Sequence, residues 1–174
     1  VSIPELKALT GMLQPAKFHA EGDVEVHTRL AIESCPENCA PDLLWAALLH
    51  DIGKPATTTI DVLSIKAHGH DKVGALISDS ILTRLGMPTH RKERIVWAIR
   101  HHQFHHSWQL RDVNIASNRH KRFVAEHDFP FLLELLKVDI LASKGHPKDL
   151  STYEFYRQFR LSVEKETIPK KLSA

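Results

Sequence analysis

The chain has 174 residues, of which 43% are hydrophobic and 25% charged, and this balance suits one globular domain with a substantial core. A net charge of +2 gives no field that would by itself indicate nucleic-acid or membrane binding. We find no signal peptide, and no apolar run reaches the roughly 18 residues of a membrane span. Two cysteines, Cys35 and Cys39, are too few for a disulfide framework, so we expect free thiols and a cytoplasmic location.

Apolar periodicity and the placement of cap residues, proline and glycine predict an irregular all-α bundle. A short first helix is expected after Pro4. The later helices are expected at about 23–34, 41–51, 70–85, 89–102, 118–126, 131–144 and 151–166. Residues 57–66 fit either a short hairpin or a loop, and residues 104–118 are expected to be irregular with at most a turn of helix.

The stretch Leu43–Pro55 organises this prediction, because it is a hydrophobic helix that ends in two adjacent polar residues. His50 shares a helical stripe with Ala47, so its imidazole should point inward, and Asp51 lies about 100° further round the helix. An unpaired charge in a dry interior costs many kcal/mol. These two side chains therefore need polar partners or a metal ion.

Two further polar residues occupy inward positions on other helices. His27 lies on the apolar stripe of its helix, and Asp139 stands where a leucine would be expected. Taken alone, His27 could be a core histidine with hydrogen-bonded ring nitrogens, and Asp139 could be paired with an arginine or with a helix N-terminus. With His50 and Asp51 they make two imidazoles and two carboxylates, which suit a divalent first-row metal better than calcium.

Three more histidines could hold a second ion. His70 begins a helix directly after Gly69, and His101 and His102 end another. If Asp51 bridges, two ions about 3.5–4 Å apart would clamp a phosphoryl group. Alternatively, His101 and His102 bind no metal and only interact favourably with the negative, C-terminal end of their helix dipole.

Lys54 lies one helical turn beyond Asp51, where its charge could hold a phosphate oxygen. The alternative is a solvated lysine at a helix end. His105 and His106 continue the histidine cluster, and we expect them to be exposed or to face a substrate. Asp51, Lys54 and His70 are the candidate catalytic residues.

The ordered set of motifs resembles the HD superfamily of metal-dependent phosphohydrolases. The closer resemblance is to the HD domain attached to CCA-adding tRNA nucleotidyltransferases and poly(A)-polymerase-like proteins. The segments on which this resemblance rests are Phe18–Thr28, Leu48–Pro55, Gly69–Ala75, His101-His102 and Lys137–Ser143. The resemblance implies a single HD domain over 1–174, with a core at about 14–145, a C-terminal helix at about 151–166 and a tail at 167–174.

The resemblance also implies roles for individual residues. The first ion would be bound by His27, His50, Asp51 and Asp139, and the second by His70, His101 and His102. His19, which matches a position just before the first ligand helix, would face the substrate or support a ligand from behind it. In the tRNA-linked relatives this domain is associated with phosphatase, 2′-nucleotidase and 2′,3′-cyclic phosphodiesterase activities.

Several family features are missing from this sequence. Nothing reads as a nucleotidyltransferase motif, so the chain alone should not add nucleotides. His101-His102 does not lead into the Gly-Tyr-Pro signature of cyclic-di-GMP phosphodiesterases. No Glu-Asp pair follows Asp51, which argues against a (p)ppGpp hydrolase.

The sequence therefore predicts a phosphomonoesterase or phosphodiesterase that acts on a nucleotide or nucleotide-like phosphoester through metal-bound hydroxide. One or two ions of manganese, iron, cobalt, nickel or zinc fit the ligand types. Two other functions remain open. One is a non-catalytic HD module for RNA binding or dimerisation, and the other is a di-iron HD oxygenase. RNA and a second copy of the chain are thus open as partners beside the small-molecule substrate, and no membrane partner is expected.

Overall fold

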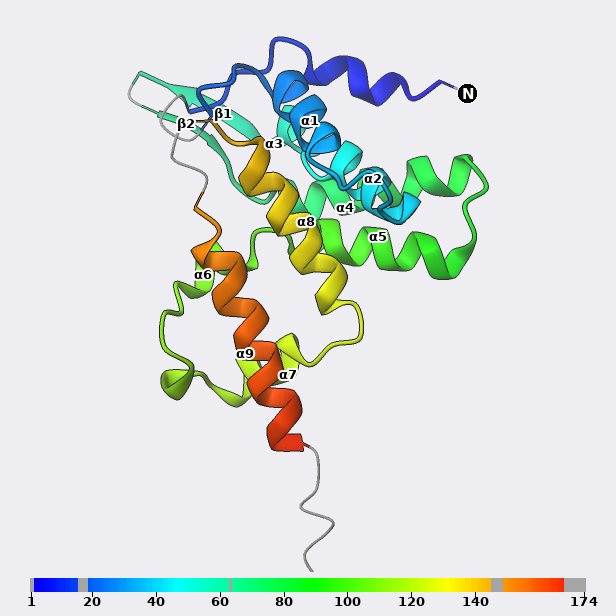
Figure 1. The fold of residues 1–174 in the computed structure, drawn as a ribbon. Helices are drawn as coiled ribbons and strands as arrows, with labels where there is room; N and C mark the ends of the chain where they lie inside the picture. Colours follow the sequence, from blue (N-terminus) through cyan, green and yellow to red (C-terminus); the bar gives the residue numbers. More distant parts are fainter. Residues whose placement is uncertain (1, 16–18, 63, 145–148, 168–174) are drawn as a thin grey trace, which may run out of the picture.

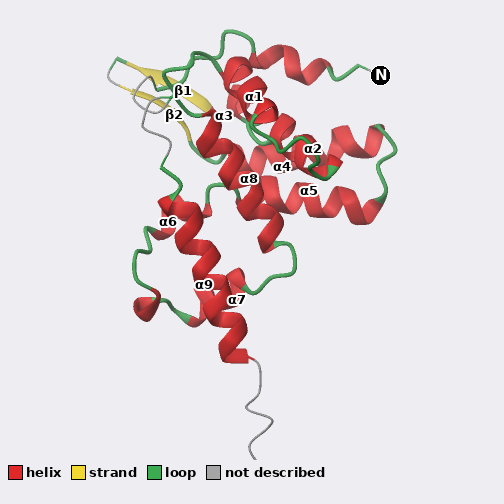
Figure 2. Cartoon of the chain, viewed as in Figure 1, coloured by secondary structure: helices red, strands yellow, loops and turns green. Residues whose placement is uncertain are grey.

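The computed structural model describes residues 2–15, 19–62, 64–144 and 149–167. The described chain is mostly helical, as predicted, with one small two-stranded sheet (Figure 2). In chain order the elements are η1 (Pro4–Leu9), α1 (Val24–Glu33), α2 (Pro41–Leu49), α3 (Lys54–Thr57), β1 (Thr58–Asp61), β2 (Ser64–Ala67), α4 (His70–Arg84), α5 (Thr89–His101), α6 (Phe104–Trp108), η2 (Val113–Ile115), α7 (Asn118–Val124), α8 (Phe129–Ala142) and α9 (Ser151–Thr167).

Helix α8 joins two groups of helices (Figure 1). On one side it contacts α1, α2 and α5, and on the other it contacts α9, which packs on α7. Helix α2 lies inside the first group, and its Ala46, Ala47 and Leu49 have no exposed surface. The small alanine side chains let neighbouring helices approach α2 closely, so the residues that end this helix lie in the interior.

Local sequence signals explain where most helices begin and end. Asp23 caps α1, and its side chain accepts a hydrogen bond from the Val26 amide at 3.0 Å, so the helix begins next to the first residue of the predicted range. Pro41 and Pro130 stand in the first turns of α2 and α8, where a missing N–H costs nothing. Gly86, with φ of 72°, follows the end of α4.

At three segments the structure either differs from the sequence prediction or settles a choice that the prediction left open. The first helix is a 3-10 helix that ends at Leu9, two residues before Gly11, which takes a left-handed φ of 73°. Residues 58–67 form an antiparallel hairpin in which Thr58 pairs with Ala67. Residues 104–108 form the short helix α6. Leu63 and the tail from residue 168 lie outside the described residues.

The turn after α2 packs tightly against the start of α4. A Cβ atom at Gly53 would collide with the carbonyl oxygen of His70 and the amide nitrogen of Gly74. Only glycine allows this approach, which brings Asp51 next to His70. Gly69, just before α4, is open to space but takes φ of 76°, so its role is conformational.

None of the helices in the described part of the chain has the length and apolarity needed to cross a membrane.

Candidate metal centre

Four side chains from α1, α8 and the end of α2 converge at the centre of the molecule. The Nε2 atom of His27 lies 3.3 Å from Nε2 of His50 and 2.9 Å from Oδ1 of Asp139. Oδ2 of Asp51 is 3.3 Å from the His50 Nε2 atom and 3.8 Å from that of His27. Ligand atoms about 2.1 Å from one ion lie roughly 3–3.5 Å apart, so these separations fit a shared cation.

The other oxygen of Asp51 faces a second group of side chains. Oδ1 lies 3.3 Å from Nε2 of His70 and 3.9 Å from Nε2 of His102, and these two nitrogens are 3.1 Å apart. Asp51, His70 and His102 are all buried, and their ligand atoms are close enough to share an ion. One carboxylate thus lies between two groups of imidazoles, which is the position of a bridging ligand.

The orientation of the histidine rings supports a cation at both places. Nδ1 of His50, His70 and His102 donates to the carbonyl oxygens of Ala47, Ala67 and Ile99 at 2.8, 2.7 and 2.7 Å, respectively. A carbonyl oxygen can only accept, so each Nδ1 carries the hydrogen, and a neutral ring then presents an Nε2 lone pair. Lone pairs and carboxylates that converge in this way need a positive charge between them, so these residues fit a metal.

Burial and neighbouring charges shift the pKa values of the same groups. Burial and the charges of His50 and His70 lower the pKa of His102 to about 3, which keeps its ring neutral and able to bind a metal. Burial alone would raise the pKa of Asp51, but His50 and Lys54 hold it well below its usual range. Burial likewise opposes charge on His27, yet hydrogen bonds with Asp139 and Glu21 raise its pKa to about 10.

Lys54 lies at the edge of this centre and is only 8% exposed. Its Nζ atom donates to Oδ2 of Asp51 at 2.7 Å and to Oε1 of Gln14 at 2.6 Å. The lysine is therefore held against the bridging carboxylate, and it is not the solvated helix-end residue that the sequence left open.

His101 is not brought into the centre. Its ring lies 4.9 Å from the Trp97 ring and 5.2 Å from the Phe123 ring, measured between centroids. The neighbouring His102 takes the inward position instead. Of the two adjacent histidines, the structure places only one beside Asp51.

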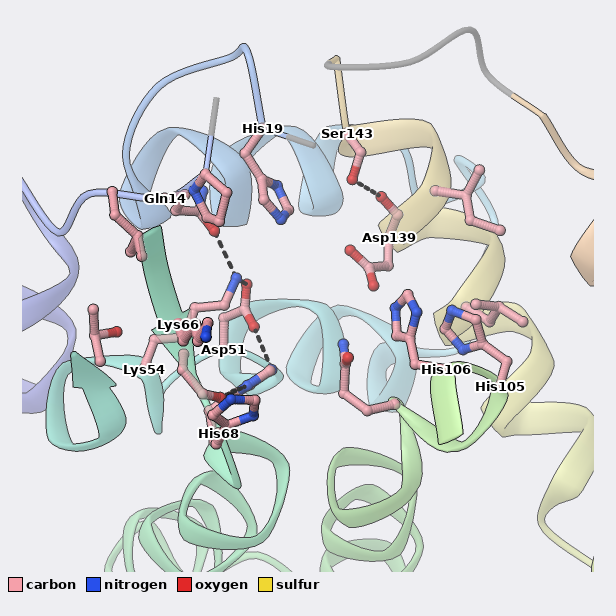
Figure 3. Close-up of a pocket in the computed structure, with 18 of the residues that line it drawn as sticks. Gln14, His19, Asp51, Lys54, Lys66, His68, His105, His106, Asp139 and Ser143 are labelled. Atoms are coloured by element: carbon pink, nitrogen blue, oxygen red, sulfur yellow. Dashed lines mark hydrogen bonds and ion pairs between the residues drawn. The ribbon is translucent and has the colours of Figure 1, made fainter. Parts of the chain in front are cut away.

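A cavity of about 660 Å³ opens onto the centre, and Asp51, Lys54, His70 and Asp139 line it. His19, His105 and His106 also line it, and the last two rings lie with centroids 3.9 Å apart and planes inclined by 39°. Figure 3 shows Lys66 and His68 on the same side of the cavity as Lys54, whereas His105 and His106 lie on the side of Asp139.

Several residues of the site escaped sequence reasoning. Glu21 and Gln14 stand in the connection before α1, where no periodicity marks an inward side chain. Lys66 and His68 belong to a segment whose structure the sequence left undecided. Lys66 lies on β2 and His68 in the turn just after it, so no periodicity in the sequence marked either residue as facing the cavity.

Comparison with known proteins agrees with this geometry. Residues 25–149 match the model of the HD domain family, and the chain therefore belongs to that family. The HD domain family falls within the superfamily of metal-dependent phosphohydrolases, whose members bind divalent metals.

Curated relatives include several called multifunctional CCA protein. The one from Teredinibacter turnerae is 36% identical over 105 residues, which are 60% of this chain and 25% of the relative. That from Neisseria meningitidis serogroup C is 37% identical over 125 residues, which are 67% of this chain and 28% of the relative. The chain thus spans about a quarter of the length of these relatives.

Proposed function

We propose that this chain is a phosphohydrolase that uses a divalent metal to cleave a phosphomonoester or phosphodiester of a nucleotide or nucleotide-like compound. The observation that carries the proposal is the position of Asp51, whose two oxygens face two separate groups of inward Nε2 atoms. Membership of the HD domain family supports the same reaction class.

The proposed ligands of the first ion are His27, His50, Asp51 and Asp139, and those of the second are Asp51, His70 and His102. His101 is left out because its ring packs against Trp97. Manganese, iron, cobalt, nickel and zinc all accept such mixed nitrogen and oxygen ligands. When bound, the metal would supply an activated water nucleophile and offset negative charge on the phosphate.

Residues around the cavity have complementary tasks in this proposal. The Lys54 ammonium group, already 2.7 Å from Asp51, would hold a phosphate oxygen as a point charge. Lys66 and His68 are exposed at the same side of the cavity and form no ion pair with another described residue, so they are available to an anionic substrate. Ile140 of α8, which lines the cavity and is partly exposed, offers an apolar contact to a sugar or base.

The test uses the full chain loaded in turn with each of the five metals. A chromogenic phosphomonoester, a chromogenic phosphodiester and a panel of nucleotides serve as substrates, run beside elemental analysis. We expect metal-dependent hydrolysis that Asp51→Asn abolishes and that His90→Ala, an exposed change on α5, leaves intact. Bound metal without hydrolysis of any substrate would overturn the proposal, and turnover that needs oxygen would indicate a di-iron oxygenase.

The similarity to multifunctional CCA proteins favours one rival, a cytoplasmic non-catalytic module that binds RNA or dimerises within a tRNA-processing protein. The rival predicts RNA binding or dimerisation that survives alanine at all of the proposed ligands. Gel-shift and sedimentation experiments on that variant separate the two functions, because a phosphohydrolase site has no need of either property.

A further inference from the structure

The side chain of Glu21 lies behind the metal centre, on the far side of His27. It has no exposed surface, and neither has the side chain of His27. Oε1 of Glu21 accepts hydrogen bonds from Nδ1 of His27 at 2.7 Å and from Nδ1 of His19 at 2.8 Å. Oε2 accepts a hydrogen bond from the backbone N–H of Lys144 at 2.8 Å. The carboxylate thus meets three donors.

These donors come from three parts of the chain. His19 belongs to the connection before α1, His27 lies on α1, and Lys144 comes two residues after the last residue of α8. Only an ionised carboxylate presents acceptor lone pairs on both oxygens and no hydrogen. An amide in the same place would turn its NH₂ group toward one of the donors.

Two of these contacts bear directly on the proposed metal ligands. The bond to Nδ1 of His27 keeps a hydrogen on that nitrogen, so that Nε2, which faces His50 and Asp139, is the nitrogen left to bind a metal. The bond to Lys144 holds the end of the helix that carries Asp139. A single side chain therefore sets the ring state of one ligand and the position of another.

We infer that Glu21 is a positioning residue of the metal centre, which tightens metal binding without touching the ion. The inference rests on the metal site proposed above. Outer partners of this kind change metal affinity by about 10–100-fold when they are replaced. The same carboxylate also accepts a hydrogen bond from His19, which lines the cavity.

The decisive variant is Glu21→Gln, which keeps the shape of the side chain and removes its charge. The Gln oxygen can face either His27 or Lys144, and the NH₂ group then opposes the other donor. If the NH₂ group faces His27, it forces hydrogen onto Nε2, where hydrogen excludes the metal. Glu25→Gln, an exposed change four residues further along the chain in α1, is the matched control for lost charge.

Calorimetric titration of the metal-free full chain with Co²⁺ or Mn²⁺ gives the affinity, and the visible bands of the cobalt form report the ligand geometry. We expect Glu21→Gln to weaken binding by about 10–100-fold and to alter the cobalt bands, with Glu25→Gln matching the parent chain. Glu21→Asp keeps the charge but has a shorter reach, so its metal affinity should lie between those of Glu21→Gln and the parent chain. Circular dichroism before titration verifies that each variant is folded.

Parent-like affinity and cobalt bands in both Glu21 variants would overturn the inference, and so would equal weakening by Glu25→Gln. A parent chain that binds neither metal would instead overturn the proposed function. The two failures are therefore distinguishable in a single set of titrations.

Discussion

The Nε2 atoms of His27 and His50 lie 3.3 Å apart, although each ring directs its Nδ1 atom to an acceptor of its own. Two neutral rings held in this way present lone pairs to each other, and this arrangement is repulsive unless a cation lies between them. In a metal-free chain a proton on His27 can fill that need, and in a loaded chain an ion would. A positive charge on His27 thus occupies the centre even in the metal-free chain.

Replacing Asp51 by asparagine should remove the bridge between the two groups of imidazoles. The amide keeps one acceptor oxygen and turns an NH₂ group toward the other group, so at most one ion should remain bound. Elemental analysis of the loaded variant should show fewer ions per chain than the parent, and phosphoester hydrolysis should fall at least about 100-fold. Unchanged metal content would contradict the bridging role.

Removing the metal should lower thermal stability. A ligand that binds only the folded state stabilises it by about 2.7 kcal/mol at a hundred times its Kd. For a chain of this size each kcal/mol corresponds to roughly 2–4 °C, so a chelator should lower Tm by about 5–10 °C. Differential scanning calorimetry with and without chelator measures the change. A Tm unaffected by both chelator and added metal would argue that no ion binds the folded chain.

Metal affinity should rise with pH. Hydrogen bonds with Asp139 and Glu21 outweigh burial and raise the pKa of His27 to about 10, so the metal-free chain holds a proton there at neutral pH. Binding must displace that proton, and affinity should increase up to tenfold per pH unit between about pH 6 and about pH 9. Titrations in buffers of different ionisation enthalpy count the released protons. An affinity that is flat over this range would show that no proton is displaced.

Replacing Lys66 by alanine should weaken substrate binding more than chemistry. The side chain lies at the cavity on the hairpin strand β2 and is absent from the proposed ligand set. We expect KM for a nucleotide substrate to rise several-fold with little change in kcat, and the effect should shrink at high salt because exposed charges are screened. Lys72→Ala, an exposed change on α4 away from the cavity, is the matched control. Equal effects of the two variants would mean that net charge alone matters.

Replacing Gly53 by alanine should damage both stability and the metal centre. The added methyl group meets the backbone of His70 and Gly74, which cannot rotate away, and overpacking of this kind costs about 1–3 kcal/mol. The displacement of His70 should also weaken metal binding. Gly86→Ala has open space around it and should cost only about 1 kcal/mol without changing metal affinity. Denaturant unfolding and metal titration of both variants check the difference.

Much of the fold was readable from local sequence signals. Asp23 and Gly86 mark helix boundaries through their own backbone chemistry, so α1 and α4 begin and end close to the predicted residues. The polar interruptions at His27, His50 and Asp139 were readable for a similar reason, since helical periodicity alone assigns them to inward faces. The HD resemblance rested on the same interruptions, and the family match agrees with it.

The choice between His101 and His102 was a matter for the tertiary structure. Adjacent residues at a helix end differ by about 100° in direction, and the packing of α5 against neighbouring helices decides which one faces Asp51. Glu21 was out of reach of the sequence, because a loop side chain has no periodicity. The sequence offered a hairpin or a loop for residues 57–66 and could not choose between them, because a short hairpin is stable only through the structure it packs on. The sequence alone thus determined most of the helices and the inward direction of His27, His50 and Asp139. Only the tertiary structure decided how those residues meet, because the distances between them depend on contacts between parts of the chain far apart in sequence.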